Sequence, residues 1–221
     1  MSSWNLQPKG ATSLLTLMRP PINALDSEAL YELAEIVEKV EVNSETRVLV
    51  ITSGIKDIFC TGGDLIYWRR IQDGREVSRI GRRVFAQLEG LSKPTLAAIN
   101  GHVVGDGMVL ALACDLRIAS ETASFRLPEL AYGFIPGWGL IGRLIALIGR
   151  AKASDLLLTG RSMKAFHAHQ TGLVNEVVPS DNLLDKALEM ARVISGFSPA
   201  ALHAAKCALL GGDEVTCFGN V

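Results

Sequence analysis

Two glycine-rich segments and one glutamate are the parts of this chain whose spacing could support chemistry. The segments are residues 59–65 (FCTGGDL) and 100–108 (NGHVVGDGM), and Glu129 follows the second by about twenty residues. A third glycine turn, residues 135–139 (IPGWG), comes soon after Glu129. Each of the first two segments follows a strand-like run and precedes a helix-like one, so backbone N–H groups at two helix starts can point into one space. Such a pair of donors is suited to holding a developing oxyanion.

The segments that must position these residues alternate between strand and helix patterns. Residues 48–52 (VLVIT) form a continuous apolar run typical of a buried parallel strand. Apolar residues at helical spacing follow Asp26 or Ser27, either of which can cap a helix. Further strands are predicted at 11–19, 95–99, 115–119, 124–126 and 174–178, and further helices at about 75–90, 109–113, 140–148, 151–159, 164–171, 183–196 and 199–210. The alternation indicates an α/β fold, with a main domain over residues 1–160 and a more helical region over 161–221.

Composition limits the classes of partner. Hydrophobic residues make up 48% and charged residues 20% of the chain, as in ordinary globular domains. Lysine and arginine number 22 against 23 aspartates and glutamates, so the net charge is 22 − 23 = −1 and we expect no nucleic-acid partner. No apolar run is long enough to span a bilayer, and the first residues lack an apolar signal core. We therefore expect a cytoplasmic protein with no membrane partner.

The cysteines and histidines show no metal-binding pattern. No two of the four cysteines have CxxC spacing, and the four histidines form no ligand pattern around them, so we expect no metal. Cys60 and Cys114 lie in apolar runs, where a free cysteine behaves as a small hydrophobic residue. We therefore expect the chain to be reduced.

Motifs in a fixed order over nearly the whole chain carry a family resemblance. They are RPPINAL at 19–25, FCTGGDL at 59–65, Lys93-Pro94 through Asn100-Gly101, ACDLRI at 113–118, LPE at 127–129, IPGWG at 135–139, LTG at 158–160 and GLVNEVV at 172–178. With these motifs the chain resembles the enoyl-CoA hydratase/isomerase (crotonase) family. The resemblance implies a spiral of ββα units with a helical C-terminal region, shortened here, and assembly as a homotrimer or a dimer of trimers. It also implies an acyl-CoA substrate and no cofactor, since coenzyme A is part of the substrate.

The resemblance assigns an oxyanion hole to the two glycine-rich segments. By position, the backbone N–H groups of Gly63 and Asp106 would bind the thioester oxygen as it becomes an enolate oxygen. Neighbouring residues and one tryptophan would contact the substrate or its coenzyme A portion: Cys60, Thr61, Gly62, Asp64, Leu65, Gly105 and Trp138. Tyr67 and Trp68 can line the acyl pocket or simply pack. From the residues alone, tight turns without a ligand are an equal alternative, a large aromatic residue is more often part of a core, and Asp64 is more simply a helix cap.

Asp106 departs from the family pattern, which usually has a third glycine at this position. Its carboxylate can point away, cap the following helix, or lie beside the enolate. The last arrangement is electrostatically unfavourable unless the carboxylate is protonated or paired. We therefore favour the capping role.

The catalytic carboxylates distinguish the reactions of this family. Hydratases of the family use two glutamates that share one water; here one of these positions is Val109 and the other is Glu129. A single glutamate beside an enolate suits proton transfer between carbons, as in the Δ3-Δ2-enoyl-CoA isomerases. We therefore expect isomerase-type chemistry through Glu129 in preference to hydration. Two alternatives stay open: an acyl-thioester enzyme of a biosynthetic pathway, acting by decarboxylation or carbon–carbon bond chemistry, and a non-catalytic scaffold homologue.

Overall fold

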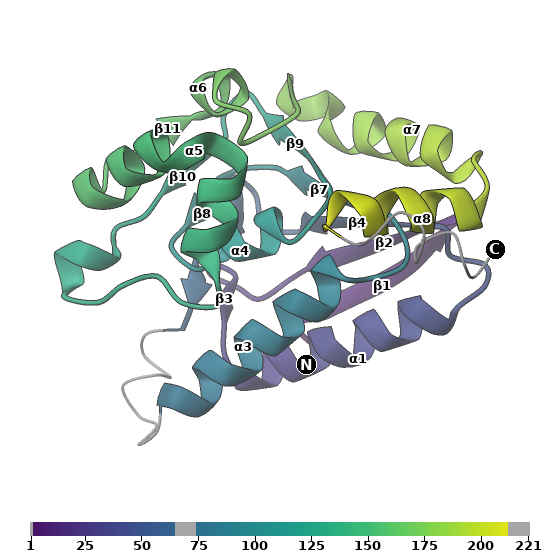
Figure 1. Cartoon of the computed structure of the whole chain (residues 1–221), viewed down its shortest axis with the longest axis horizontal. Coiled ribbons are helices and arrows are strands. Elements are labelled where there is room, and N and C mark those ends of the chain that lie inside the picture. Colours follow the sequence, from purple (N-terminus) through teal and green to yellow (C-terminus); the bar gives the residue numbers. More distant parts are fainter. Residues whose placement is uncertain (1, 65–73, 212–221) are drawn as a thin grey trace.

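A six-stranded sheet runs through the middle of the molecule (Figure 1). The structure, a computed structural model, describes residues 2–64 and 74–211. The strand order is β1-β2-β4-β7-β9-β12; β1 is antiparallel to β2, and all other neighbours are parallel. The strands are β1 (Trp4–Lys9), β2 (Thr12–Leu17), β4 (Val48–Ser53), β7 (Thr95–Ile99), β9 (Leu116–Ser120) and β12 (Glu176–Val178).

Helices cover both faces of this sheet, which explains why its central strands are apolar throughout. Figure 1 shows α1 and α3 running together on one side of the sheet, with α7 on the other. These helices span Ser27–Val42 (α1), Gly74–Glu89 (α3) and Leu183–Ser195 (α7). Successive residues of β4 alternate between the two sides, because Leu49 packs in the core with α1 and α3 and Val50 packs with α7.

Two smaller sheets carry the glycine-rich segments. One has the strand order β11-β10-β8-β5, and the other pairs β3 with β6 in parallel. The strands are β3 (Ala24–Leu25), β5 (Ile58–Cys60), β6 (Gly62–Gly63), β8 (His102–Val104), β10 (Ser124–Arg126) and β11 (Met163–Lys164). The first glycine pair is thus itself a short strand, and the second glycine-rich segment, residues 100–108, contains β8.

The remaining helices follow the glycine-rich and C-terminal segments. They are α4 (Gly107–Leu112), η1 (Glu129–Tyr132), α5 (Leu140–Thr159), α6 (Ala165–Gln170), η2 (Ser180–Asn182) and α8 (Pro199–Leu209). The two helices predicted at 140–148 and 151–159 form the single element α5, with non-helical Gly149 at their junction. The C-terminal region adds β12 to the main sheet, and the division of the chain at residue 160 stays a prediction.

The α/β class and the longer predicted elements are confirmed. Helix α1 begins as expected, because the Asp26 carboxylate accepts a hydrogen bond from the Ala29 N–H at 2.9 Å. The sequence patterns do not predict β1, since most of its residues are exposed and only Trp4 is buried.

The cysteines follow the prediction in part. Cys60 and Cys114 are free and buried, whereas Cys207 is disulfide-bonded, so the expectation of a fully reduced chain is wrong at that residue. A disulfide requires two Cα atoms within about 7 Å, an approach that sequence spacing does not reveal. Within residues 2–64 and 74–211, no helix is long and apolar enough to cross a membrane. The same residues contain no group of three or more His, Cys, Asp or Glu side chains that could hold a metal ion.

Candidate active site

The candidate site is a cavity of about 890 Å³ between the turns that follow β2, β6, β8 and β10. Its walls combine backbone of the glycine-rich segments with apolar side chains and a few carboxyl groups. The lining residues are Arg19, Pro20, Pro21, Ile22, Ala24, Thr61, Gly63, Asp64, Val104, Gly105, Asp106, Pro128, Glu129, Tyr132, Phe134 and Ile135. A cavity that joins apolar walls to a few convergent polar groups is the usual form of a small-molecule site.

A buried asparagine fixes the turn before β3 onto the first glycine-rich segment. Asn23 is fully buried and has a positive φ of 53°. Its amide nitrogen donates to the Phe59 carbonyl at 3.1 Å and to Ser53 Oγ at 2.8 Å. Its amide oxygen accepts from the Arg19 N–H at 2.7 Å. These bonds join β2, β4 and β5 at one point and hold the wall of the cavity.

The two glycine-rich segments touch each other through their backbones. Gly62 has a φ of +85°, and a Cβ added there would lie 2.9 Å from the Asp106 nitrogen and 2.8 Å from the Gly107 nitrogen. Only glycine therefore allows the first segment to lie directly on the second. The next residue, Gly63, lines the cavity together with Asp106.

Glu129 is held against the second glycine-rich segment. It begins η1, is 7% exposed, and has one carboxyl oxygen, Oε2, buried without a hydrogen-bond partner among the described residues. Its other oxygen, Oε1, lies so close to Gly105 that a Cβ added to that glycine would be 2.4 Å away. Burial raises the pKa of Glu129 to about 7, and the Asp106 carboxylate adds to the rise. Hydrogen bonding to the backbone N–H groups of Glu129 and Asp106 opposes it.

The Asp106 carboxylate does not cap α4, so the favoured prediction for this side chain is wrong. Asp106 has helical backbone angles, φ −59° and ψ −12°, and its side chain makes no capping hydrogen bond. A capping side chain normally needs an extended backbone to reach the first free N–H groups of its helix. Instead, Asp106 Oδ1 accepts a hydrogen bond of 2.5 Å from the N–H of Gly137, in the third glycine turn. Burial raises the pKa of Asp106 to about 6, and the Gly137 hydrogen bond opposes the rise.

Comparison with known proteins identifies the family of this chain. A sequence model described as "Enoyl-CoA hydratase/isomerase" matches residues 8–213. The chain belongs to the enoyl-CoA hydratase/isomerase family. The "Putative enoyl-CoA hydratase/isomerase YngF" of Bacillus subtilis is 41% identical over 205 residues, which are 91% of this chain and 79% of the relative. The "Short-chain-enoyl-CoA hydratase" of Clostridium acetobutylicum is 36% identical over 95% of this chain and 81% of the relative.

Solved structures of the family share the fold. The crystal structure of an enoyl-CoA hydratase from Bacillus anthracis superposes with a TM-score of 0.92 and 34% identity, over 98% of this chain and 86% of that one. The structure of Pseudomonas aeruginosa DspI also gives a TM-score of 0.92, with 32% identity over 96% of this chain and 87% of that one. The predicted crotonase-type fold is therefore confirmed.

The structure brings most of the predicted site residues of this family member together. Three residues predicted to bind or react with the substrate, Gly63, Asp106 and Glu129, line one cavity. Thr61, Asp64 and Gly105, predicted to contact the substrate, line it as well, and Gly62 packs beneath it against the second segment. The roles assigned to these residues by resemblance stay predictions.

Other predicted contact residues lie elsewhere. Cys60 is buried with its thiol against the Asn23 carbonyl at 3.3 Å, and burial raises its pKa to about 12. Trp138 is 1% exposed, and its ring centroid lies 5.3 Å from that of Phe85. Neither residue is among the described residues that line the cavity.

The helix that Asp64 was expected to cap falls outside the described residues, as do Leu65, Tyr67 and Trp68. The Asp64 carboxylate itself lies 3.6 Å from the Arg19 guanidinium.

Two features of the site are not predicted from the sequence, namely the anchoring role of Asn23 and the Gly137 N–H as a hydrogen-bond donor. The place of Asp106 at the cavity is one of the alternatives that the sequence leaves open. Asn23 and Gly137 lie in motifs that carry the family resemblance, so the motifs indicate their importance but not their contacts.

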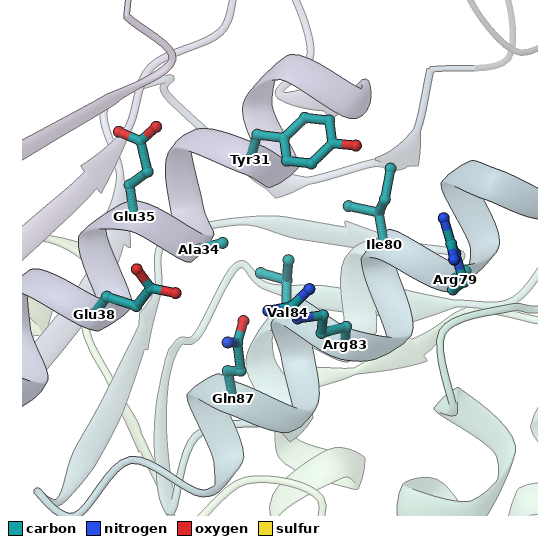
Figure 2. Close-up of a pocket in the computed structure, with 9 residues that line it drawn as sticks. All are labelled: Tyr31, Ala34, Glu35, Glu38, Arg79, Ile80, Arg83, Val84 and Gln87. Atoms are coloured by element: carbon teal, nitrogen blue, oxygen red, sulfur yellow. The ribbon is translucent and has the colours of Figure 1, made fainter.

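A second, smaller cavity of about 480 Å³ lies between α1 and α3 and shares no lining residue with the first. Figure 2 shows Glu35 and Glu38 extending from α1, while Arg79 and Arg83 extend from α3. Because the two walls carry opposite charges, this cavity favours neither anionic nor cationic ligands. The larger cavity is therefore the better candidate active site.

Proposed function

We propose that this chain acts on enoyl-CoA thioesters and that Glu129 carries the proton that moves during the reaction. The observation that supports this most directly is the Glu129 carboxyl, buried in the cavity beside Gly63 and Asp106 with one oxygen unpaired among the described residues. The substrate class follows from family membership and from relatives named as short-chain-enoyl-CoA and 2,3-dehydroadipyl-CoA hydratases.

The backbone N–H groups of Gly63 and Asp106 are the proposed donors to the thioester oxygen. Removing a proton next to a thioester carbonyl places negative charge on that oxygen. Donors that are already fixed in position stabilise this charge without reorganising, and losing one typically costs about 2.7–4 kcal/mol. The contact between Gly62 and the nitrogen of Asp106 supports the proposal, because it brings the two segments to one place.

The proposed reaction is migration of a carbon–carbon double bond. The Glu129 carboxylate takes a proton from carbon 2 of a 3-enoyl thioester, the dienolate forms, and the same group returns a proton at carbon 4. A pKa of about 7 suits a group that must both accept and donate a proton near neutral pH. Val109 is fully buried in α4 and supplies no carboxylate there, which favours this single-glutamate reaction over hydration by two glutamates.

Hydration of a 2-enoyl thioester is the second candidate. The names of several relatives favour it, and so does the second carboxyl in the cavity, that of Asp106. The two reactions use the same oxyanion donors and differ in whether water adds to the substrate.

The test is to assay the purified chain with 3-enoyl-CoA and 2-enoyl-CoA, before and after Glu129→Gln. Glutamine keeps the size of the side chain but cannot take up a proton, so isomerisation should fall by about 10²–10⁴-fold. Asp185→Asn is the matched control, because Asp185 is exposed on α7 and should leave activity unchanged. Fast hydration that Glu129→Gln leaves undiminished would overturn the proposal.

We also propose that the chain assembles as a trimer or a dimer of trimers, as the family resemblance implies. Large exposed apolar side chains, including Leu158 at 70% and Phe166 at 71% exposure, support burial in an assembly. Light scattering of the purified protein measures the mass, and a monomer at micromolar concentration would refute this assembly.

A further inference from the structure

A second carboxyl group shares the cavity with Glu129. Asp106 comes from the second glycine-rich segment and is 9% exposed. Its carboxylate is fixed by the 2.5 Å hydrogen bond from the Gly137 N–H. The two carboxyls thus come from different turns and open into one space.

Among the described residues that line this cavity, no cation pairs with the Asp106 carboxyl. Arg19 is the one cationic residue among the described lining residues, and its guanidinium pairs with Asp26 and Asp64. No ion pair links Asp106 to a lysine, arginine or histidine within residues 2–64 and 74–211. Burying an unpaired carboxylate lowers stability, and a glycine at this position would avoid that loss. Residues that oppose stability in this way are concentrated at functional sites.

The surroundings of the Asp106 and Glu129 carboxyls differ, and the difference indicates which of the two holds a proton. Asp106 Oδ1 accepts a short N–H hydrogen bond, which favours its ionised form. The Glu129 carboxyl also accepts hydrogen bonds from backbone N–H groups, those of Glu129 and Asp106, but its Oε2 is buried with no donor among the described residues. Burial is the larger effect and favours the protonated form of Glu129. The expected resting state is therefore an ionised Asp106 beside a protonated Glu129.

We propose that Asp106 is the second proton-transfer group of this site, so that Asp106 and Glu129 together hydrate 2-enoyl thioesters. This inference rests on the proposed function of the same cavity and extends it to the residue that replaces a glycine. The pair provides the two carboxyls that hydration needs, although Val109 supplies none.

The reaction balances with these two groups alone. The Asp106 carboxylate takes a proton from water as the water oxygen bonds to carbon 3 of the substrate. The electron pair of the carbon 2–carbon 3 double bond moves toward the thioester, and the enolate oxygen is held by the N–H donors. The enolate then takes the proton of the Glu129 carboxylic acid at carbon 2, which gives the 3-hydroxyacyl thioester. Transfer of the proton from Asp106 to Glu129 restores the starting state.

The pKa values of the two carboxyls support this distribution of charge. Burial raises the pKa of Asp106 to about 6 and that of Glu129 to about 7, so the pair carries one proton mainly between these values. The other titratable or charged residues among the described lining residues are Arg19, Asp64 and Tyr132. The Cys60 thiol, whose pKa burial raises to about 12, interacts with Asp106 from outside the lining. The rate of hydration should therefore rise and then fall as the pH increases, giving a bell-shaped profile. A single titrating group would instead change the rate in one direction only.

The experiment compares hydration and isomerisation in Asp106→Asn and Asp106→Gly. Asparagine keeps an oxygen that can accept the Gly137 hydrogen bond, but it cannot take a proton from water. Glycine removes the side chain and keeps the backbone N–H. Both variants should lose about 10²–10⁴-fold in hydration of 2-enoyl-CoA. Isomerisation of 3-enoyl-CoA uses the same oxyanion donors but only the Glu129 side chain for proton transfer, so the ratio of hydration to isomerisation should fall at least about tenfold in both variants.

Each result has a defined meaning. The free energy of unfolding of Asp106→Asn in urea shows whether the variant is folded, and a fall in the ratio of hydration to isomerisation in the folded variant supports the proposal. Hydration that stays near the parent rate overturns it, as does a parent chain that does not hydrate at all. Loss of both reactions in both variants also overturns it, because the carboxyl would then serve the structure only. Isomerisation that survives Glu129→Gln is a different result and refutes the proposed function instead.

Discussion

Replacing Gly105 with alanine tests how the carboxyl of Glu129 is held in place. Gly105 ends the second glycine-rich turn with a φ of +55°, and its Cα faces Glu129 Oε1. The added methyl group would lie 2.4 Å from that oxygen. The substitution therefore changes two things at once: the conformational energy of the turn and the position of the carboxyl.

The two effects have different sizes. A non-glycine residue in the left-handed region loses about 1–2 kcal/mol of stability. The oxygen must also retreat from 2.4 Å to an ordinary contact of at least 3.4 Å, and 3.4 − 2.4 = 1.0 Å. Because Glu129 is a flexible side chain, this movement adds little to the loss of stability. A 1 Å displacement of a reacting group can nevertheless reduce the rate about 10²-fold, which is about 2.7 kcal/mol of activation free energy.

The assay measures kcat for enoyl-CoA turnover together with the free energy of unfolding in urea. Gly10→Ala is the matched control, since Gly10 has a φ of +65° and an added Cβ there meets no atom within 4 Å. Gly10 lies in the turn between β1 and β2, outside the cavity. We expect similar losses of stability in the two variants and a loss of rate in Gly105→Ala alone.

Two results would refute this reasoning. If Gly105→Ala keeps the turnover of Gly10→Ala, contact with Gly105 does not set the position of the Glu129 carboxyl. If both variants lose the same large fraction of activity, the effect comes from backbone strain in general.

Asn23, Glu129 and the two buried thiols provide three further predictions. Asn23→Ala should lower the free energy of unfolding by about 3 kcal/mol or more, measured in urea, because it leaves several buried hydrogen-bonding groups unpaired at about 1–3 kcal/mol each. For Glu129, the folded pKa of about 7 exceeds the ordinary 4.5, so the folded state binds more protons than the unfolded state and stability falls as pH rises between these values. Glu129→Gln should remove this loss and be more stable than the parent at pH 8, by up to about 3 kcal/mol from 2.5 pK units, with no such gain at pH 4. Cys60 and Cys114, whose thiol pKa values burial raises to about 12, should resist alkylation in the folded protein at pH 8 and react in urea, as peptide mapping by mass spectrometry would show.

Each of these predictions has a control and a contrary result. Asn5→Ala, at an exposed position of β1, should change stability little, and an equally small effect of Asn23→Ala would contradict the anchoring role. Equal pH dependence of unfolding in the parent and in Glu129→Gln would show that Glu129 titrates normally. Alkylation of Cys60 without denaturant would mean that this buried thiol becomes accessible to solvent in the folded state.

The sequence predicts most of the long elements because their signals are local. Helix α1 has an aspartate cap followed by apolar residues at helical spacing, and β4 is a continuous apolar run. Each pattern lies within a single element. The short strands β3 and β6 have two residues each and form only because they pair with each other. A two-residue strand is too short to show a hydrophobic periodicity in the sequence.

Within the candidate site, the sequence by itself determined the glycine-rich segments, the presence of Glu129 and the absence of a carboxylate at Val109. These features depend on residue type and order alone. The direction of the Asp106 side chain was decided only by the tertiary structure. Its carboxylate could have met the helix beginning at the next residue, but it accepts a hydrogen bond from Gly137, 31 residues away. Sequence neighbours establish that a helix can begin after Asp106, whereas the packing of a distant turn over the cavity determines which N–H group the carboxylate reaches.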